Sequence, residues 1–92
     1  MANYIVSYDL NGPTPTHQAM DKHMEKAGWT RGQILETVWY VGTSADIDAV
    51  ASYVQQILSS NDSLAVVSCL GGRVQNLLIP TPNLVNAWNQ NG

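Results

Sequence analysis

Asp9 and His17 are the two side chains whose types and positions suit chemistry. Asp9 ends the apolar segment 4–9 and is followed by Asn11-Gly12 in a loop. A carboxylate at the end of a strand can hold Mg²⁺ when water and substrate phosphates supply the other ligands. One carboxylate per chain is a poor magnesium site, but a two-fold dimer would bring two copies of Asp9 together. The alternative is a turn residue, in which Asp9 accepts a hydrogen bond from the N–H of Asn11 or Gly12.

His17 is the second candidate, and His23 follows it in the same predicted helix. Their spacing turns a helix by about 240°, so the two rings lie on different faces and do not share a metal ion. Because His17 comes early in the helix, it is expected to point back toward the Asp9 loop. There it would act as a general acid or base, or orient a phosphate. The alternative is an ordinary histidine at the boundary between core and solvent.

Charge and cysteine content narrow the choice of function. The chain has only four basic residues, Lys22, Lys26, Arg31 and Arg73, and a net charge of −3. Nucleic-acid binding depends on basic patches that neutralise phosphates, so this composition weighs against a DNA or RNA ligand. Cys69 is the single cysteine. It excludes an internal disulfide and a cysteine pair for zinc, and we expect it to be a buried strand residue.

The size of the chain predicts one small domain. A chain of 92 residues buries somewhat more than about 60% of its unfolded surface, so its stability is modest and oligomerisation is expected. We assign residues 1–79 to the domain and residues 80–92 to a C-terminal tail. No run of apolar residues is long enough for a membrane span, and the N-terminus enters a strand pattern directly, without a signal core. We therefore expect a cytoplasmic protein.

Hydrophobic periodicity places the first elements. Alternating apolar residues predict a strand over 3–9, and Thr14-Pro15 fits the start of a helix that ends at Gly28. Residues 33–41 form a second extended segment that is expected to bend near Glu36-Thr37 into two consecutive strands.

The second half repeats this alternation of helix and strand. Thr43 and Asp46 have the spacing of a capping box before a strongly periodic helix over 47–58. Strands are predicted over 63–69 and 73–79, separated by Gly71-Gly72. A short tail helix beginning at Thr81-Pro82 is expected to carry Leu84, Val85 and Trp88 on one face.

This order of elements predicts an α+β fold. Strands separated by helices need right-handed crossovers, and both long helices then cover one face of an antiparallel sheet. That is the ferredoxin-like β-α-β-β-α-β arrangement, here with an extra C-terminal strand and a short tail helix.

Three segments resemble a known family. The strand "YIVSYDL", the strand pair and helix "ILETVWYVGTSADIDAVASYVQQIL", and the turn and strand "SSNDSLAVVSCL" occur in that order. The series resembles the small CRISPR adaptation subunit, the second Cas protein of the CRISPR-associated endoribonuclease family. It is similar as well to VapD-like toxins and to small SinR-like proteins of bacteria and phages. The resemblance covers residues 3 to about 79.

The resemblance implies a ferredoxin-like homodimer. In this family the last strand crosses to the partner's sheet, and the two strand-one aspartates face each other near the two-fold axis. Members are described as magnesium-dependent nucleases or as non-catalytic scaffolds that bind DNA and an integrase. Only Asp9 matches the proposed metal-binding aspartate. The family commonly has several arginines after the first strand, whereas residues 11–17 here read Asn-Gly-Pro-Thr-Pro-Thr-His.

We therefore expect a dimeric, non-catalytic protein-binding module in a phage or defence-related setting, with no cofactor. The alternative is an Mg²⁺-dependent endonuclease that cleaves RNA or DNA, with Asp9 of each subunit as the metal ligand and catalytic carboxylate and His17 assisting.

Overall fold

The structure is a computed structural model, and it describes residues 2–71 and 77–91. It is a small α+β fold with four strands and three helices in this described part. The elements in chain order are β1 (Ala2–Asp9), α1 (His17–Lys26), β2 (Thr30–Leu35), β3 (Val38–Thr43), α2 (Ile47–Gln55), β4 (Ser63–Ser68) and α3 (Thr81–Asn91).

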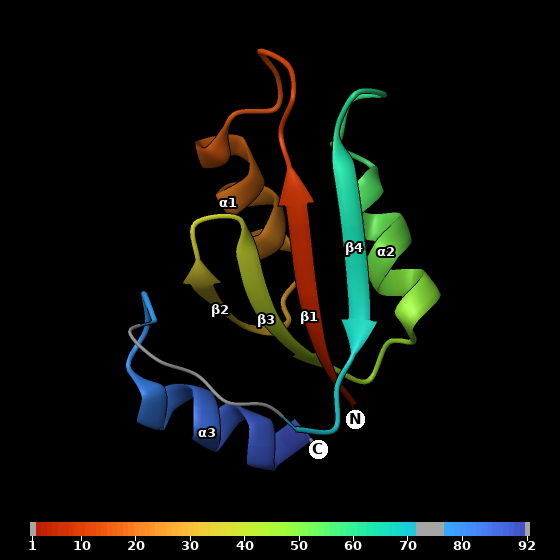
Figure 1. Cartoon of the computed structure of the whole chain (residues 1–92). Coiled ribbons are helices and arrows are strands. Elements are labelled where there is room, and N and C mark those ends of the chain that lie inside the picture. The colour runs from red at the N-terminus through yellow and green to blue at the C-terminus, as the bar shows by residue number, and fades with distance from the viewer. Residues whose placement is uncertain (1, 72–76, 92) are drawn as a thin grey trace.

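The four strands form one sheet in the order β2-β3-β1-β4, and every neighbouring pair is antiparallel (Figure 1). Strand β1 is central, with Val6 opposite Trp39 of β3 and Val66 of β4. The predicted bend at Glu36-Thr37 is confirmed, because a turn at these residues separates β2 from β3.

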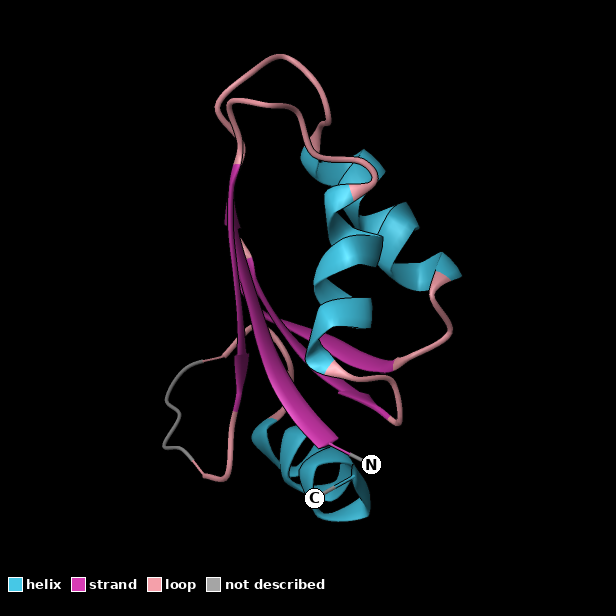
Figure 2. Cartoon of the chain, turned by 90° about the vertical axis from the view of Figure 1, so that its right-hand side faces the viewer, coloured by secondary structure: helices cyan, strands magenta, loops and turns pink. Residues whose placement is uncertain are grey.

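The sheet separates two unequal layers. Helices α1 and α2 cover one face, as predicted, and α3 lies against the other face near one end of the strands (Figure 2). We call these the helix face and the α3 face. Side chains alternate along β1, so Tyr4, Val6 and Tyr8 enter the helix-face core while Ile5 packs on the α3 face.

The helix-face core is closed. Met20 and Met24 of α1 and Val50 and Val54 of α2 are completely buried against the sheet. The remaining buried members are Tyr4, Val6, Tyr8, Trp39 and Val41.

The α3-face core is smaller. It is built around Ile34, Tyr40 and Leu84, with Trp88 packed beside them. The prediction that Leu84, Val85 and Trp88 share one face is wrong for Val85, which is 47% exposed. Two consecutive residues are separated by about 100° on a helix, so Leu84 and Trp88, four apart, are the pair that faces the sheet.

Both long helices begin at a different capping residue from the one predicted. Helix α1 is capped by Thr16 rather than Thr14, because the Thr16 hydroxyl accepts from the N–H of Ala19. Helix α2 is capped by Asp46, whose carboxylate accepts from the N–H of Ala49. Thr43 instead bonds the N–H of Ala45 before the helix. In each case the residue directly before the helix has the extended backbone that a cap requires.

The C-terminal strand predicted over 73–79 lies partly outside the described residues, since 72–76 are not described. Its described part, 77–79, is not a strand. Instead the N–H of Leu78 donates to the carbonyl oxygen of Ile34 over 3.1 Å, and Ile79 lies directly over Gly32. A Cβ at Gly32 would come within 2.6 Å of the Ile79 Cδ1 atom, so the absent side chain makes room for this segment.

Candidate functional site

Asp9 lies at the last position of β1, directly opposite Ser63 of β4. Because its neighbour Tyr8 enters the helix-face core, Asp9 belongs to the α3 face, and its side chain is exposed. A shallow hollow of about 160 Å³ borders it, and Ser7, Ser63 and Ala65 also line this hollow. The predicted site therefore consists of one exposed carboxylate beside two serines on neighbouring strands.

This site is incomplete as a metal centre within one chain. Among residues 2–71 and 77–91, no group of three or more histidine, cysteine, aspartate or glutamate side chains is placed to hold a metal ion. Mg²⁺ requires nearly octahedral oxygen ligands, and one carboxylate leaves most positions to water. The predicted role of Asp9 as a metal ligand would need a second chain.

Asp62 takes the bond that the turn interpretation gave to Asp9. The N–H of Asn11 donates to Asp62 Oδ1 over 2.8 Å, and the N–H of Ser59 donates to Asp62 Oδ2 over 2.8 Å. The side-chain amide of Asn11 donates to the carbonyl of Asn61 over 2.8 Å. These bonds fasten the β1–α1 loop to the α2–β4 loop and leave Asp9 out of them. Hydrogen bonds from the N–H groups of Asn11 and then Ser59 lower the pKa of the Asp62 carboxyl.

His17 is the first residue of α1, and its side chain is exposed. Within the described part of the chain it makes no hydrogen bond to Asp9. Its position at the helix start agrees with the prediction, and its catalytic role remains a prediction.

His23 joins the two long helices. Its ring stacks on Tyr53 of α2, with ring centroids 4.1 Å apart and an angle of 12° between the planes. Its Nε2 atom lies 2.6 Å from the carbonyl oxygen of Tyr53, while the Tyr53 hydroxyl donates to the His23 carbonyl over 2.6 Å. A carbonyl only accepts, so Nε2 carries the proton. His23 is therefore a part-buried histidine that links α1 to α2 at the edge of the core.

Tyr8 precedes Asp9 in the sequence, but its phenol lies on the helix face of the sheet, opposite the Asp9 side chain. Burial raises the pKa of the Tyr8 hydroxyl, and the nearby Asp21 charge adds to that, against the opposing effect of a hydrogen bond from Trp39. The Trp39 indole N–H donates to the Tyr8 oxygen over 3.0 Å. This pair belongs to the core and is not positioned to exchange protons with a ligand at Asp9.

The basic residues do not gather around Asp9. Lys22 and Lys26 lie on α1, on the opposite side of the sheet from the Asp9 side chain. Arg31 lies on β2, the edge strand farthest from β4. Arg73, the fourth basic residue of the sequence, lies outside the described residues. The described cations therefore provide no phosphate-binding patch at the candidate site.

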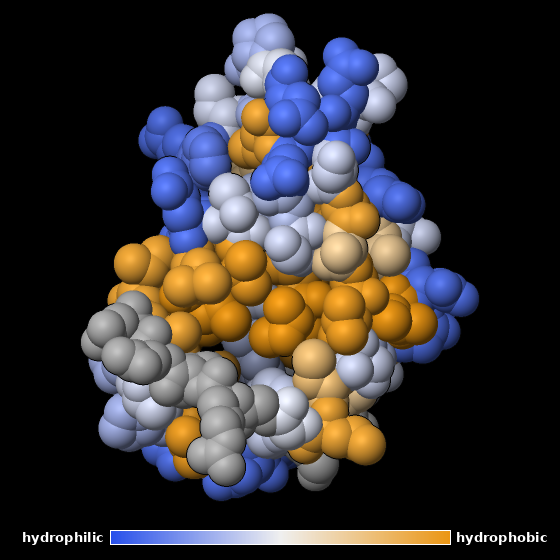
Figure 3. Space-filling view, in the orientation of Figure 1, coloured by the Kyte–Doolittle hydropathy of each residue, from blue (hydrophilic) through white to orange (hydrophobic). Residues whose placement is uncertain are grey.

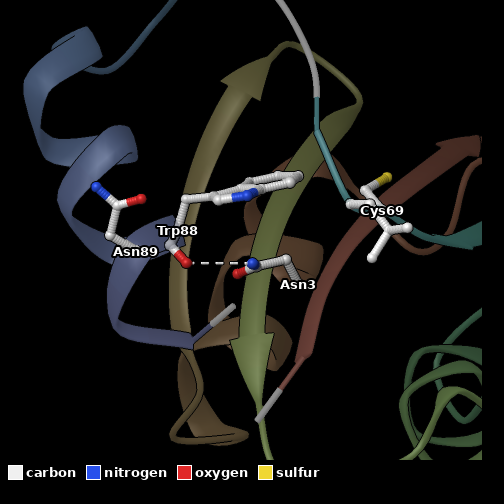
Figure 4. A pocket seen from close by; sticks show the side chains of 5 residues that line it. Asn3, Cys69, Trp88 and Asn89 are labelled. Carbon is white, nitrogen blue, oxygen red and sulfur yellow. Dashed lines mark hydrogen bonds between the residues drawn. The ribbon is translucent and has the colours of Figure 1, made fainter.

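A second hollow, of about 250 Å³, lies where α3 meets the start of β1, and sequence reasoning missed it (Figure 4). Asn3 is 3% exposed at its floor, and its amide donates to the carbonyl of Trp88 over 3.2 Å. Tyr40 donates its hydroxyl proton to the side-chain oxygen of Asn3, Oδ1. An asparagine inside a predicted apolar strand was the available signal, because a buried amide needs partners.

Cys69 lines the same hollow. The prediction of a buried strand residue is wrong, because Cys69 follows the last residue of β4 and is only partly buried. Its backbone N–H donates to the carbonyl oxygen of Asn3 over 3.0 Å, which continues the β1–β4 ladder by one step.

Apolar side chains form a band across the α3 face, above α3 in the view of Figure 3. We define the apolar band as Ile5 and Val38 of the α3-face core, Val67, which is paired with Ile5, Leu35, which is paired with Val38, and Leu78, whose N–H bonds the Ile34 carbonyl. Leu35, Val67 and Leu78 are 49%, 51% and 64% exposed, respectively. Exposed apolar side chains that adjoin one another mark interaction surfaces more often than isolated ones do.

No helix in the described part of the chain has the length and apolar character required to cross a bilayer. Comparison of the chain with protein-family models, with curated proteins and with solved structures found no match.

Proposed function

We propose that this chain is a ferredoxin-like protein similar to the small CRISPR adaptation subunit and its VapD-like and SinR-like counterparts. Two observations support this proposal. The sheet order β2-β3-β1-β4 is the one that two interleaved β-α-β units produce, and both long helices lie on one face. The resemblance covers residues 3 to about 79, so α3 (Thr81–Asn91) lies outside it.

We propose further that it acts as a dimeric, non-catalytic protein-binding module in a phage or defence-related setting. The apolar band carries this proposal, because Leu35, Val67 and Leu78 are about half exposed or more on a face that α3 covers only in part. When a partner covers the exposed half of such a side chain, the removal of this apolar surface from water stabilises the complex by roughly 1 kcal/mol or more. A face of this kind suits a protein partner better than a phosphate chain.

The electrostatics support the same choice. The chain carries a net charge of −3, and its described lysines lie on α1, away from Asp9. Binding to DNA or RNA would have to neutralise phosphates with basic groups, and the residues that the structure describes on the α3 face supply none.

A capture experiment with matched surface variants tests the proposal. Val67→Ser with Leu78→Ser removes half-exposed apolar surface from the apolar band, whereas Val85→Ser removes a similar group from the outer side of α3. We expect a host protein to be retained by the wild type and by Val85→Ser but lost by the double variant. Equal retention by all three proteins would contradict a binding role for the apolar band.

The second candidate is an Mg²⁺-dependent endonuclease, and the exposure of Asp9 beside a hollow with Ser7 and Ser63 favours it. In this case Asp9 from each of two subunits would hold the metal, which would activate water for attack on a phosphodiester, with His17 assisting. An RNA and DNA cleavage assay with Mg²⁺ and Mn²⁺ should compare wild type, Asp9→Asn and His17→Ala. The non-catalytic proposal predicts no cleavage that depends on Asp9, and a loss of at least 100-fold in Asp9→Asn would overturn it.

A further inference from the structure

The backbone of β4 offers hydrogen-bonding groups to an additional strand. In an antiparallel ladder, residues alternate between exchanging bonds with the neighbouring strand and directing both groups away from it. The Cys69 N–H bonds the Asn3 carbonyl of the β1 strand, which fixes the phase of this alternation. Ser63, Ala65 and Val67 therefore bond β1, and the groups that point outward belong to Leu64, Val66 and Ser68.

This outer edge is open and unprotected within the described part of the chain. Strand β4 is last in the sheet order, and its only strand partner is β1. Its sequence, Ser-Leu-Ala-Val-Val-Ser, contains neither a charge nor a proline. Natural edge strands usually carry a lysine, a proline or a bulge that prevents pairing, and β4 contains neither a lysine nor a proline.

We propose that this edge pairs antiparallel with β4 of a second copy of the chain, about a two-fold axis through Val66, to form a continuous eight-stranded sheet. The inference rests on the dimer of the proposed function and specifies its surface. The outward N–H and C=O groups of one β4 strand must face those of the other. An axis at Val66 meets this condition, because it places Leu64 opposite Ser68 of the second copy. In this register all three outward residues are used, for about six inter-chain hydrogen bonds.

Side chains and charges fit a second copy in this register. On the α3 face, Ala65 lies opposite Val67 of the second copy, so a small apolar group meets a larger one on each side of the axis. Each chain has a net charge of −3, but the edge itself is uncharged. Asp62, the acid next to β4, lies opposite Leu70 of the second copy rather than opposite another acid. An isologous interface requires this self-complementarity.

The pairing has a consequence for Asp9. Asp9 lies level with Ser63, three residues from the axis, and one strand further from the seam. With about 3.4 Å per residue along a strand and 4.8 Å between strands, the two Asp9 positions lie about 25 Å apart. Ligands of one Mg²⁺ lie about 2.1 Å from the ion, so this dimer cannot share a metal between the two carboxylates. The edge pairing therefore favours the non-catalytic function.

Replacement of one outward N–H tests the pairing. Ser68→Pro removes a donor that points away from β1, and Ser68→Ala is the matched control because it keeps that donor. Sedimentation equilibrium should give a dimer dissociation constant at least ten-fold weaker for Ser68→Pro, since two inter-chain bonds are lost per dimer, and a value within about three-fold of wild type for Ser68→Ala. Unchanged dimerisation of a folded Ser68→Pro protein would overturn the inference.

A cross-link tests the register without disturbing the backbone. In a Cys69→Ser background, Val66→Cys places two thiols on the axis, where Cα atoms about 5.5 Å apart suit a disulfide. We expect covalent dimers after mild oxidation, and none from Ser44→Cys, an exposed control in the loop before α2. Failure of Val66→Cys to cross-link an intact dimer would remove this register.

The wild-type protein separates the two levels of the proposal. A wild-type protein that is monomeric at tens of micromolar would contradict both the dimer of the proposed function and the edge pairing. The same holds if the β4 edge instead pairs with a strand of a different protein. The wild type could also be a dimer that Ser68→Pro does not weaken and that Val66→Cys does not cross-link. That result would contradict only the edge pairing, and the dimer would then use another face.

Discussion

The two faces of the sheet are closed to different degrees. On the helix face, four side chains from α1 and α2 are completely buried against β1 and β3. On the α3 face, a single helix and the segment 77–79 cover Tyr40 and Ile34 but leave Leu35, Val67 and Leu78 about half exposed or more. The same strands supply both faces, so the difference arises from how many helices the chain provides for each.

This difference separates stability from interaction. Closed packing resembles an organic solid, in which the loss of one side chain leaves a cavity. A face that is open to solvent can relax or rehydrate after a substitution, and it retains apolar surface for a partner. We therefore expect substitutions on the helix face to lower the free energy of unfolding most, and substitutions on the α3 face to alter binding more than folding.

The largest expected effect is that of Met20→Ala. Met20 is completely buried between α1 and the sheet, and removal of such a side chain costs about 3 kcal/mol because the cavity closes only in part. Chemical denaturation of the wild type and the variant measures this difference. Gln18→Ala, on the exposed side of α1, is the control and should change stability by less than about 0.5 kcal/mol. A cost below 1 kcal/mol for Met20→Ala would mean that the helix face is not closed.

Trp88→Ala should cost less, about 2 kcal/mol. Its indole packs at 5.8 Å from the Tyr40 ring, but it is only partly buried. Denaturation monitored by far-ultraviolet circular dichroism should show the lower stability, while proton exchange at the amides of β1 and β3 stays protected. A larger loss for Trp88→Ala than for Met20→Ala would reverse the ranking of the two faces.

Alkaline pH should act on the helix face through Tyr8. Burial raises the folded-state pKa of its hydroxyl above the usual value of 10.0, so the folded state holds this proton more tightly than the unfolded state. The associated stability is complete below pH 10 and is lost as the pH rises through the folded pKa. Denaturation at several pH values above 10 should show a smaller decline for Tyr8→Phe than for wild type. Parallel declines would show that Tyr8 does not contribute.

Acid should act on the loops through Asp62, with the smallest effect. Hydrogen bonds from Asn11 and Ser59 lower its folded-state pKa below 3.8, so the contribution is present above pH 3.8 and is lost as the pH falls through the folded pKa. Asp62→Asn should lose less stability between pH 5 and 2 than the wild type. Glu36→Gln, which removes an exposed carboxylate elsewhere, should leave that pH dependence unchanged.

The sequence was most informative where one face of an element is buried. Alternation of Tyr4, Val6 and Tyr8 predicted β1, and the spacing of Val50 and Val54 predicted α2, because a buried face imposes its period on the residues. The first residues of the two long helices were predicted less accurately. Thr14 and Thr43 have the right type for a cap, but Thr16 and Asp46 have the backbone geometry.

The candidate site was predictable only in part. The position of Asp9 followed from the end of an alternating strand. Its neighbours did not, since the pairing of Asp9 with Ser63 joins residues far apart in the chain. The bond from Asn11 to Asp62 and the stacking of His23 on Tyr53 likewise depend on how the loops and helices meet. Local patterns contain no information about such contacts until the topology is known.

The composition of β4 also bears on the behaviour of the protein in concentrated solution. A six-residue strand that contains Leu64, Val66 and Val67 and neither a charge nor a proline is the kind of segment that seeds aggregation when its edge stays uncovered. A chain that paired with that edge, such as the proposed second copy, would also protect the protein from uncontrolled strand addition. Selection for solubility alone would then act against loss of that pairing, independently of any activity at Asp9.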